Sequence, residues 1–305
     1  MKKCTIICNK ESGRGINSKN LDLICTTLKN HGYTVKVHTT KNESDAISYV
    51  KTMPYTDLVL SIGGDGTFNQ VVTGNFQRKD KLLLSHIPVG TTNDIGNMLG
   101  MSKNIVKTVE DIVNGEVKQV DIGVINNNPF VYVAGFGKFI NVPYATKRKF
   151  KKAFGHLAYL VNGVKEFFQK TKLYEIEYKI DDKVYHGLYS LILVSNATRI
   201  AGFNNIYKDV KLDDDKLEVV FCNLTRRKDL ARSILLLLTH DITEIPGIYC
   251  HRVNNLSIKF KEKTKLHWTI DGEKLKGNSK IINISVDKNI NMLLPKKNLK
   301  NLFKN

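Results

Sequence analysis

The chain has 305 residues, of which 42% are hydrophobic and 25% are charged, and these proportions are typical of a folded globular protein of about two domains. Its formal net charge of +18 favours anionic neighbours such as lipid headgroups, nucleic acid or nucleotide phosphates, although a general compositional bias toward lysine and asparagine would produce the same surplus. The five cysteines show no paired spacing, which argues against a zinc site or a disulfide framework and favours a reducing compartment.

The first 125 or so residues are predicted to alternate between strands and helices. Short apolar runs that end at polar residues or glycines indicate strands at residues 4–8, 35–37, 58–62 and 82–87. Apolar residues at helical spacing indicate helices around residues 21–28 and 46–50 and over residues 105–114. Strands separated by helices of this size predict a parallel sheet with helices on both faces.

Beyond residue 125 the pattern changes to closely spaced strands. Apolar and polar residues alternate strictly from Tyr174 to Ile180 before a turn at residues 181–183, and one long helix is expected near residues 153–169. A strand is also expected at residues 120–125, just before this change, and the remaining ones at residues 130–134, 188–195, 216–222, 256–260, 266–270 and 281–286. We therefore expect an α/β domain over residues 1–125, completed by residues 290–305, and a mainly-β, sandwich-like domain over residues 126–289.

Two of the strongest apolar strands end in polar loops that contain glycines and lead into helices. These loops are Gly63-Gly64-Asp65-Gly66-Thr67 and Pro88-Val89-Gly90-Thr91-Thr92-Asn93-Asp94. Three glycines in five residues leave backbone N–H groups open to an anion, and the helix that follows adds partial positive charge. A tight turn in which Asp65 caps a helix is the alternative for the first loop alone. Neither loop has the Walker A or the GxGxxG pattern, so a phosphate site here would be of another kind.

These loops resemble those of the bacterial diacylglycerol kinase-like lipid kinases, which are relatives of sphingosine and ceramide kinases. The resemblance extends over nearly the whole chain, and each motif is modest alone but specific in this order and spacing. The further matching motifs are Asn9 with Ser12-Gly13-Arg14-Gly15, Val120-Asp121-Ile122-Gly123, Leu212-Asp213-Asp214 and Asp271-Gly272-Glu273.

The resemblance implies an ATP-binding α/β domain, a C-terminal β-sandwich domain and an active site between them. It implies that Asp65, Asp94 and Asp121 form an acidic set that handles Mg²⁺, and that Glu273 takes the proton of the substrate hydroxyl. The ATP-binding residues that it implies are Asn9, Ser12, Gly13, Arg14, Thr40, Gly63, Gly64, Asp65, Gly66, Thr67, Gly90, Thr91 and Asn93. From the residues alone, Asp271-Gly272-Glu273 would be interpreted as an ordinary hairpin turn.

A second metal loop is implied, but its sequence departs from the family pattern. Asp214 would bind the ion, with help from the backbone carbonyls of Lys211 and Lys216. The family has Asp-Asp-Gly where this chain has Asp213-Asp214-Asp215, so the geometry of the loop, and whether it binds an ion at all, are left open.

Three basic clusters contain apolar residues, at residues 147–152, 226–228 and 296–304. Such clusters suit an anionic membrane surface, although a solvated face that binds nothing gives the same pattern. Because no signal peptide is visible, we expect a cytoplasmic protein that associates peripherally with the inner face of the membrane. No nucleic-acid partner is expected, since the common motifs are missing, and a homodimer is compatible with the resemblance.

The predicted function is ATP- and Mg²⁺-dependent phosphorylation of a lipid hydroxyl, with diacylglycerol as the first choice of substrate. Phosphatidylglycerol, ceramide and polyprenols also fit. One alternative is an NAD kinase, which shares the Gly-Gly-Asp-Gly-Thr loop, and another is a non-catalytic, nucleotide-regulated membrane-binding protein. The Asp271-Gly272-Glu273 motif and the loop at residues 88–94 favour the lipid kinases.

Overall fold

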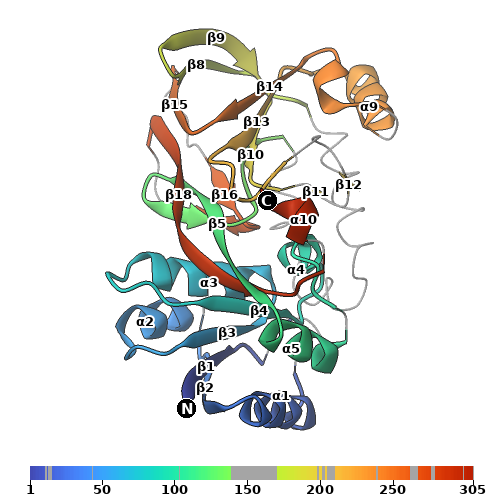
Figure 1. Ribbon diagram of the computed structural model, residues 1–305. Helices are drawn as coiled ribbons and strands as arrows, with labels where there is room; N and C mark the ends of the chain where they lie inside the picture. Colours follow the sequence, from blue (N-terminus) through green and yellow to red (C-terminus); the bar gives the residue numbers. More distant parts are fainter. Residues whose placement is uncertain are drawn as a thin grey trace. The chain divides into compact units, whose positions relative to one another are not determined.

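The computed structural model describes the chain except for residues 11, 13–15, 43, 103, 139–169, 198, 201–202, 205–209, 238–239, 262–266, 276–278, 298 and 305 (Figure 1). The helix expected at residues 153–169 and the basic cluster at residues 147–152 therefore lie outside the described residues, as do Gly13 and Arg14. The chain forms two compact units, one of residues 1–121 with 288–305 and one of residues 122–287.

The first unit is built on a parallel sheet with the strand order β2-β1-β3-β4. These strands are β1 (Lys2–Cys8), β2 (Tyr33–Thr39), β3 (Leu58–Gly63) and β4 (Leu84–Pro88). The C-terminal part of β18 (Ile281–Leu294) pairs in parallel with β4, with Met292 opposite Leu84. All residues of β3 are buried, so both of its faces are covered, as in a parallel strand between two layers of helices.

The helices of this unit are α1 (Ser18–Asn30), α2 (Asp45–Thr52), α3 (Asp65–Phe76), α4 (Asp94–Met98), α5 (Ile105–Val113) and α10 (Leu299–Leu302). Helix α1 packs against α5, and α2 packs against α3. The side chain of Asn17 caps α1 by accepting a hydrogen bond from the Asn20 N–H at 2.7 Å, and α1 turns Ile24 and Leu28 into the core. The predicted α/β class of the N-terminal part is confirmed.

The second unit contains two antiparallel sheets. The N-terminal part of β18 pairs with β15, β15 with β8, and β8 with β9, while the other sheet has the order β14-β13-β10-β7-β16-β17. The strands are β7 (Val133–Gly137), β8 (Tyr174–Ile180), β9 (Lys183–Tyr189), β10 (Leu191–Ser195), β13 (Leu217–Cys222), β14 (Ile248–Val253), β15 (Asn255–Phe260), β16 (Trp268–Ile270) and β17 (Glu273–Lys274). Shorter elements are β6 (Asn128–Phe130), β11 (Arg199–Ile200), β12 (Phe203–Asn204), α9 (Arg227–Leu236) and a 3₁₀ turn at Ile242–Glu244.

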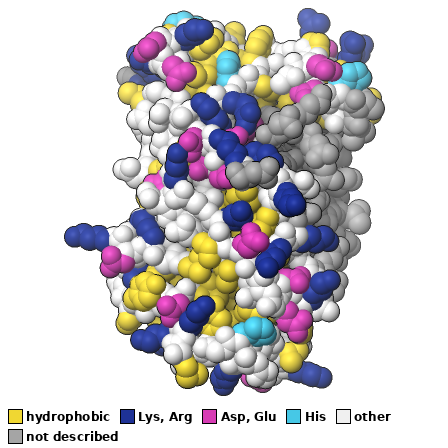
Figure 2. All heavy atoms as spheres, in the orientation of Figure 1, with side chains coloured by type: hydrophobic (Ala, Val, Ile, Leu, Met, Phe, Trp, Pro, Cys, Tyr) yellow, Lys and Arg dark blue, Asp and Glu magenta, His cyan; other side chains and the backbone are white. Residues whose placement is uncertain are grey.

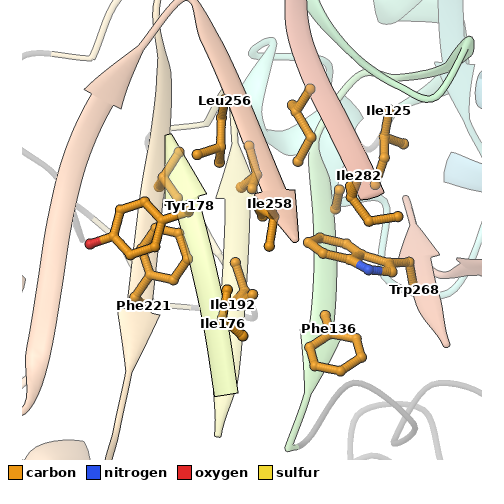
Figure 3. Close-up of a cluster of buried hydrophobic side chains, with 14 of the residues drawn as sticks. Ile125, Phe136, Ile176, Tyr178, Ile192, Phe221, Leu256, Ile258, Trp268 and Ile282 are labelled. Atoms are coloured by element: carbon orange, nitrogen blue, oxygen red, sulfur yellow. The ribbon is translucent and has the colours of Figure 1, made fainter. Parts of the chain in front are cut away.

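One hydrophobic core fills the space between these two sheets (Figure 3). Leu256, Ile258 and Phe260 of β15 alternate with more exposed residues and point into it. The rings of Tyr178 and Phe221, from opposite sheets, stack with their centroids 4.0 Å apart. The predicted sandwich-like class of the second half is confirmed.

Several predicted boundaries differ from the structure. The strand expected at residues 130–134 is interrupted at Val131 and Tyr132, because their backbone N–H groups bond to the carboxylate of Asp271 instead of a neighbouring strand. The strand expected at residues 281–286 continues to Leu294, where it joins the sheet of the first unit.

Both passages of the chain between the two units occur inside strands. The boundary after Asp121 lies within β5 (Glu116–Ile125), and the boundary before Lys288 lies within β18. Where β18 meets β4, the Ser85 hydroxyl donates a hydrogen bond to the Leu293 carbonyl at 2.7 Å. In the described part of the chain, no helix combines the length and the apolarity that crossing a bilayer requires.

Candidate active site

Three loops follow β1, β3 and β4 at the carboxyl ends of these adjacent parallel strands. Backbone hydrogen bonds connect them: the Asn9 N–H donates to the Ile62 carbonyl at 3.0 Å, and the Val89 N–H donates to the Gly63 carbonyl at 2.8 Å. The Asn9 side-chain amide also donates to the Thr67 hydroxyl at 3.3 Å. Ligands of open parallel sheets bind at this edge, so the two glycine loops lie where the sequence places a nucleotide.

Glycines allow these loops to touch. A Cβ added to Gly90 would lie 2.6 Å from the Cα of Gly64, and a Cβ added to Gly64 would lie 3.0 Å from the Ser12 hydroxyl. Real Cβ atoms hardly ever come as close as the first of these distances, so Gly90 is required by the close approach of the two backbones. Ser12, Gly64 and Gly90 therefore lie together.

Asp65 connects the first glycine loop to the second. Its carboxylate accepts hydrogen bonds from the Asp94 N–H at 3.1 Å, the Ile95 N–H at 3.0 Å and the Thr92 hydroxyl at 3.2 Å. Burial raises the pKa of the Asp65 carboxyl, and these hydrogen bonds oppose that shift. Asp65 is thus the first residue of α3 but caps the start of α4, which makes it a residue that positions the second loop.

The other residues implied in ATP binding are distributed around this edge. Thr67 is buried in the first turn of α3 beside Gly66, and Thr91 precedes Asn93, whose left-handed φ of 53° is one that Asn tolerates. The Thr40 N–H donates to the Cys8 carbonyl at 2.9 Å, just beyond β2. The structure therefore gathers the described members of the predicted nucleotide set at the ends of neighbouring strands, while their role remains a prediction.

The predicted acidic set comes from three different elements of the first unit. Asp94 begins α4, and Asp121 lies in β5 with only 2% of its surface exposed. Kinase Mg²⁺ is bound by one or two carboxylates together with the substrate phosphates. The donor chemistry of Asp94 and Asp121 fits such an ion, whereas both oxygens of Asp65 already accept hydrogen bonds within the protein.

Glu273 follows a two-residue hairpin turn between β16 and β17. Ile270 pairs with Glu273, and the intervening Asp271 and Gly272 both have positive φ angles, 47° and 82°, as a type I′ turn requires. The hairpin interpretation of this motif is therefore confirmed. The turn presents Glu273 at an exposed position in the second unit.

Asp271 is the residue of this motif that sequence reasoning missed. Its carboxylate is buried and accepts hydrogen bonds from three consecutive N–H groups, those of Val131 at 2.7 Å, Tyr132 at 2.9 Å and Val133 at 2.9 Å. The Asp271 N–H returns a hydrogen bond to the Val133 carbonyl at 2.8 Å. The hairpin that carries Glu273 is thereby fixed to the segment between β6 and β7.

The implied metal loop is held together by the protein's own groups. One oxygen of Asp214 accepts the Lys216 N–H at 3.0 Å, and the other pairs with the guanidinium of Arg252. Lys211 and Lys216, whose carbonyls were expected to assist, flank the loop. The described residues contain no group of three His, Cys, Asp or Glu side chains able to hold a metal ion. Because the guanidinium of Arg252 already pairs with one oxygen of Asp214, this carboxylate does not fit a Mg²⁺ site.

Comparisons with known proteins agree with this architecture. Residues 3–125 match the family described as diacylglycerol kinase catalytic domain. The chain is 30% identical over 276 residues to the diacylglycerol kinase of Bacillus subtilis (strain 168), covering 90% of each protein, and 28% identical over 282 residues to that of Staphylococcus saprophyticus, covering 91% of this chain and 92% of the relative.

Solved structures show the same fold. The crystal structure of a diacylglycerol kinase from Bacillus anthracis superposes with a TM-score of 0.74 at 21% identity, covering 96% of this chain and 97% of that one. A second crystal structure from that bacterium gives a TM-score of 0.80 at 22% identity, covering 96% and 95%. Together with the relative from Bacillus subtilis, which aligns over nine tenths of both chains, these matches confirm the resemblance found in the motifs. The chain belongs to the diacylglycerol kinase-like family and is a lipid kinase.

Proposed function

We propose that this lipid kinase transfers the γ-phosphoryl group of ATP to the hydroxyl of diacylglycerol, which yields phosphatidate and ADP. The observation that carries this proposal is the contact between the two glycine loops, Gly64 against Gly90, at the ends of adjacent parallel strands. The family assignment and the names of the relatives support the choice of substrate.

The first unit would bind the phosphates of ATP through backbone N–H groups. Helix α3 is twelve residues long and begins at the first glycine loop, so its N-terminus offers N–H groups and partial positive charge. Asn9, Ser12 and Thr67 add polar side chains beside it. Asp65 would act as a positioning residue, because its hydrogen bonds hold the second loop against the first.

Asp94 and Asp121 would hold the Mg²⁺ that accompanies ATP. When bound, this ion neutralises the charge that develops on the phosphates during transfer. Both carboxylates belong to the first unit, and the buried position of Asp121 favours a cationic partner for it. Asp65, the other carboxylate of the two glycine loops, already accepts hydrogen bonds from the protein at both of its oxygens.

Glu273 would be the general base. An alcohol becomes a stronger nucleophile as it loses its proton, and a positioned carboxylate can take that proton. In the proposed step the hydroxyl oxygen forms a bond to the γ-phosphorus, the bond between that phosphorus and the bridging oxygen of ADP breaks, and the proton moves to Glu273. The short, hydrogen-bonded hairpin would keep this carboxylate in place.

Incubation of the pure protein with labelled ATP, Mg²⁺ and mixed micelles is the direct test. Separate tubes would offer diacylglycerol, phosphatidylglycerol, ceramide or a polyprenol, and a further tube would offer NAD. We expect label in phosphatidate. Label in another lipid alcohol alone would contradict diacylglycerol as the substrate but support lipid kinase activity. Label in NAD alone would contradict the proposed function altogether.

We also propose that the enzyme reaches its substrate on an anionic membrane surface. Many lysine and arginine side chains are visible in Figure 2, interspersed with acidic ones. A pocket of about 350 Å³ in the first unit concentrates this charge. It is lined by Glu116, Lys118, Lys296, Leu299, Lys300, Phe303 and Lys304. Leu299 and Phe303 are buried, and the Lys118 ammonium lies over the Phe303 ring, 5.8 Å from its centroid, so the pocket combines cationic groups with apolar ones, as suits a phospholipid headgroup.

Replacing both Lys296 and Lys300 by glutamate is expected to weaken binding to vesicles that contain phosphatidylglycerol by more than roughly 30-fold. Each cation near an anionic surface contributes about 1 kcal/mol, so the loss of two cations alone gives about 30-fold, and the two new carboxylates add repulsion. Vesicle sedimentation measures it, with the double variant Lys19→Glu and Lys51→Glu as a control of equal charge. Equal binding by the two double variants would contradict a membrane role for this pocket.

A further inference from the structure

Arg252 joins two carboxylates at one end of the second sheet of the sandwich. It lies on β14 directly opposite Glu218 on β13. Its Nε atom is 3.2 Å from Oε1 of Glu218, and its Nη2 atom pairs with Oδ2 of Asp214. A single guanidinium therefore forms two ion pairs through different nitrogens, which is a geometry that lysine cannot provide.

Both carboxylates are shielded from water. The side chains of Glu218 and Asp214 are 2% and 8% exposed, whereas that of Arg252 is 47% exposed. Burial raises the pKa of Glu218 to about 7, and the positive charge of Arg252 opposes this shift. Buried carboxylates of this kind require a nearby cation, and the guanidinium remains charged at every physiological pH.

Two further hydrogen bonds hold the loop at residues 211–216, which precedes β13. The Lys216 N–H satisfies the second oxygen of Asp214, and the Lys216 ammonium reaches the side chain of Asn254 just beyond β14. Asp215 adopts a left-handed φ of 65° at the position where the family pattern has glycine. Asp is one of the few residues that tolerate this conformation, so the loop keeps its turn without the glycine.

We propose that Arg252 is the built-in cation of the loop at residues 211–216 and stands in place of the Mg²⁺ that the family resemblance implies there. A divalent ion on Asp214 would have to displace the guanidinium from the oxygen that it already occupies. The loop then needs no metal to fold, and the Mg²⁺ requirement of the enzyme comes only from the ion that accompanies ATP.

Thermal unfolding in EDTA and in MgCl₂, without ATP or lipid, tests this inference. The wild-type unfolding temperature is expected to be the same in both solutions. The variant Arg252→Gln is expected to unfold about 10 °C lower in EDTA, because it leaves two buried carboxylates without a cation, and to recover part of this loss in MgCl₂. Arg232→Gln, which changes an exposed arginine on α9 of the same unit, is the matched control and should behave as the wild type.

The variant Asp214→Asn separates this loop from other Mg²⁺ sites. Any wild-type stabilisation by Mg²⁺ that persists in Asp214→Asn arises elsewhere and leaves the inference standing. A wild-type stabilisation that Asp214→Asn abolishes would overturn it, since the loop would then bind the ion despite Arg252. Because the measurement uses neither ATP nor lipid, its outcome is independent of which alcohol the enzyme phosphorylates.

Discussion

Glu273→Gln is expected to phosphorylate lipid roughly 100- to 10,000-fold more slowly than the wild type while binding ATP equally well. Glutamine has the shape of glutamate but cannot accept the hydroxyl proton, and general-base catalysis accounts for a rate factor of this size. Single-turnover assays with labelled ATP measure the chemical step. Titration calorimetry with a non-hydrolysable ATP analogue measures nucleotide binding.

The neighbouring Lys274→Gln is a matched control, because Lys274 is exposed on the same short strand. It should retain the wild-type rate. Turnover by Glu273→Gln within a factor of about three of the wild type would remove Glu273 as the base. Another carboxylate would then have to act as the base, and Asp94 and Asp121 of the first unit would be the first candidates.

Asp271→Ala is expected to destabilise the second unit by about 3 kcal/mol or more. The substitution leaves three N–H groups without their acceptor, two between β6 and β7 and one at the start of β7, and each buried group left unsatisfied costs about 1–3 kcal/mol. The chain has one tryptophan, Trp268, which is buried on the strand that precedes the hairpin, so its fluorescence reports this unit during urea unfolding.

Asp181→Ala provides the comparison, since Asp181 has the same left-handed conformation, with a φ of 51°, in the exposed turn between β8 and β9. It should cost about 1 kcal/mol, the strain of an alanine in the left-handed conformation. Equal unfolding midpoints for the two variants would show that the hydrogen bonds of Asp271 do not stabilise the unit. Lipid phosphorylation by Asp271→Ala should also fall, because the hairpin that carries Glu273 loses its anchor.

Local pattern was sufficient to predict the first half of the fold. The apolar run at residues 58–62 and the helical spacing of Ile24 and Leu28 each determine an element with little help from elsewhere. Strand β14 was missed because its residues are mostly part-exposed and show no clean alternation. Helix α9 was missed because its arginines suggested a surface cluster and its leucines form a run without helical spacing.

The candidate site was predictable only where its chemistry lies in one short segment. The glycine loops are visible in the sequence because the glycines stand close together. The partners of Asp65 lie 27 to 30 residues along the chain, Arg252 lies 38 residues from Asp214, and Val131 lies 140 residues from Asp271. No local pattern reveals contacts at such separations, since they arise only when the sheets form.

The first unit can be completed during synthesis only after the C-terminal part of β18 has been made. The hydrogen bond between Ser85 and Leu293 joins residues 208 positions apart, so β4 has an open edge until the ribosome has made the C-terminal part of β18. An open strand edge invites pairing with other chains, and long-range strand pairing is slow. Nascent chains therefore expose this edge to other chains during the interval, and one interrupted before residue 288 will carry both glycine loops on a sheet that lacks the strand beside β4.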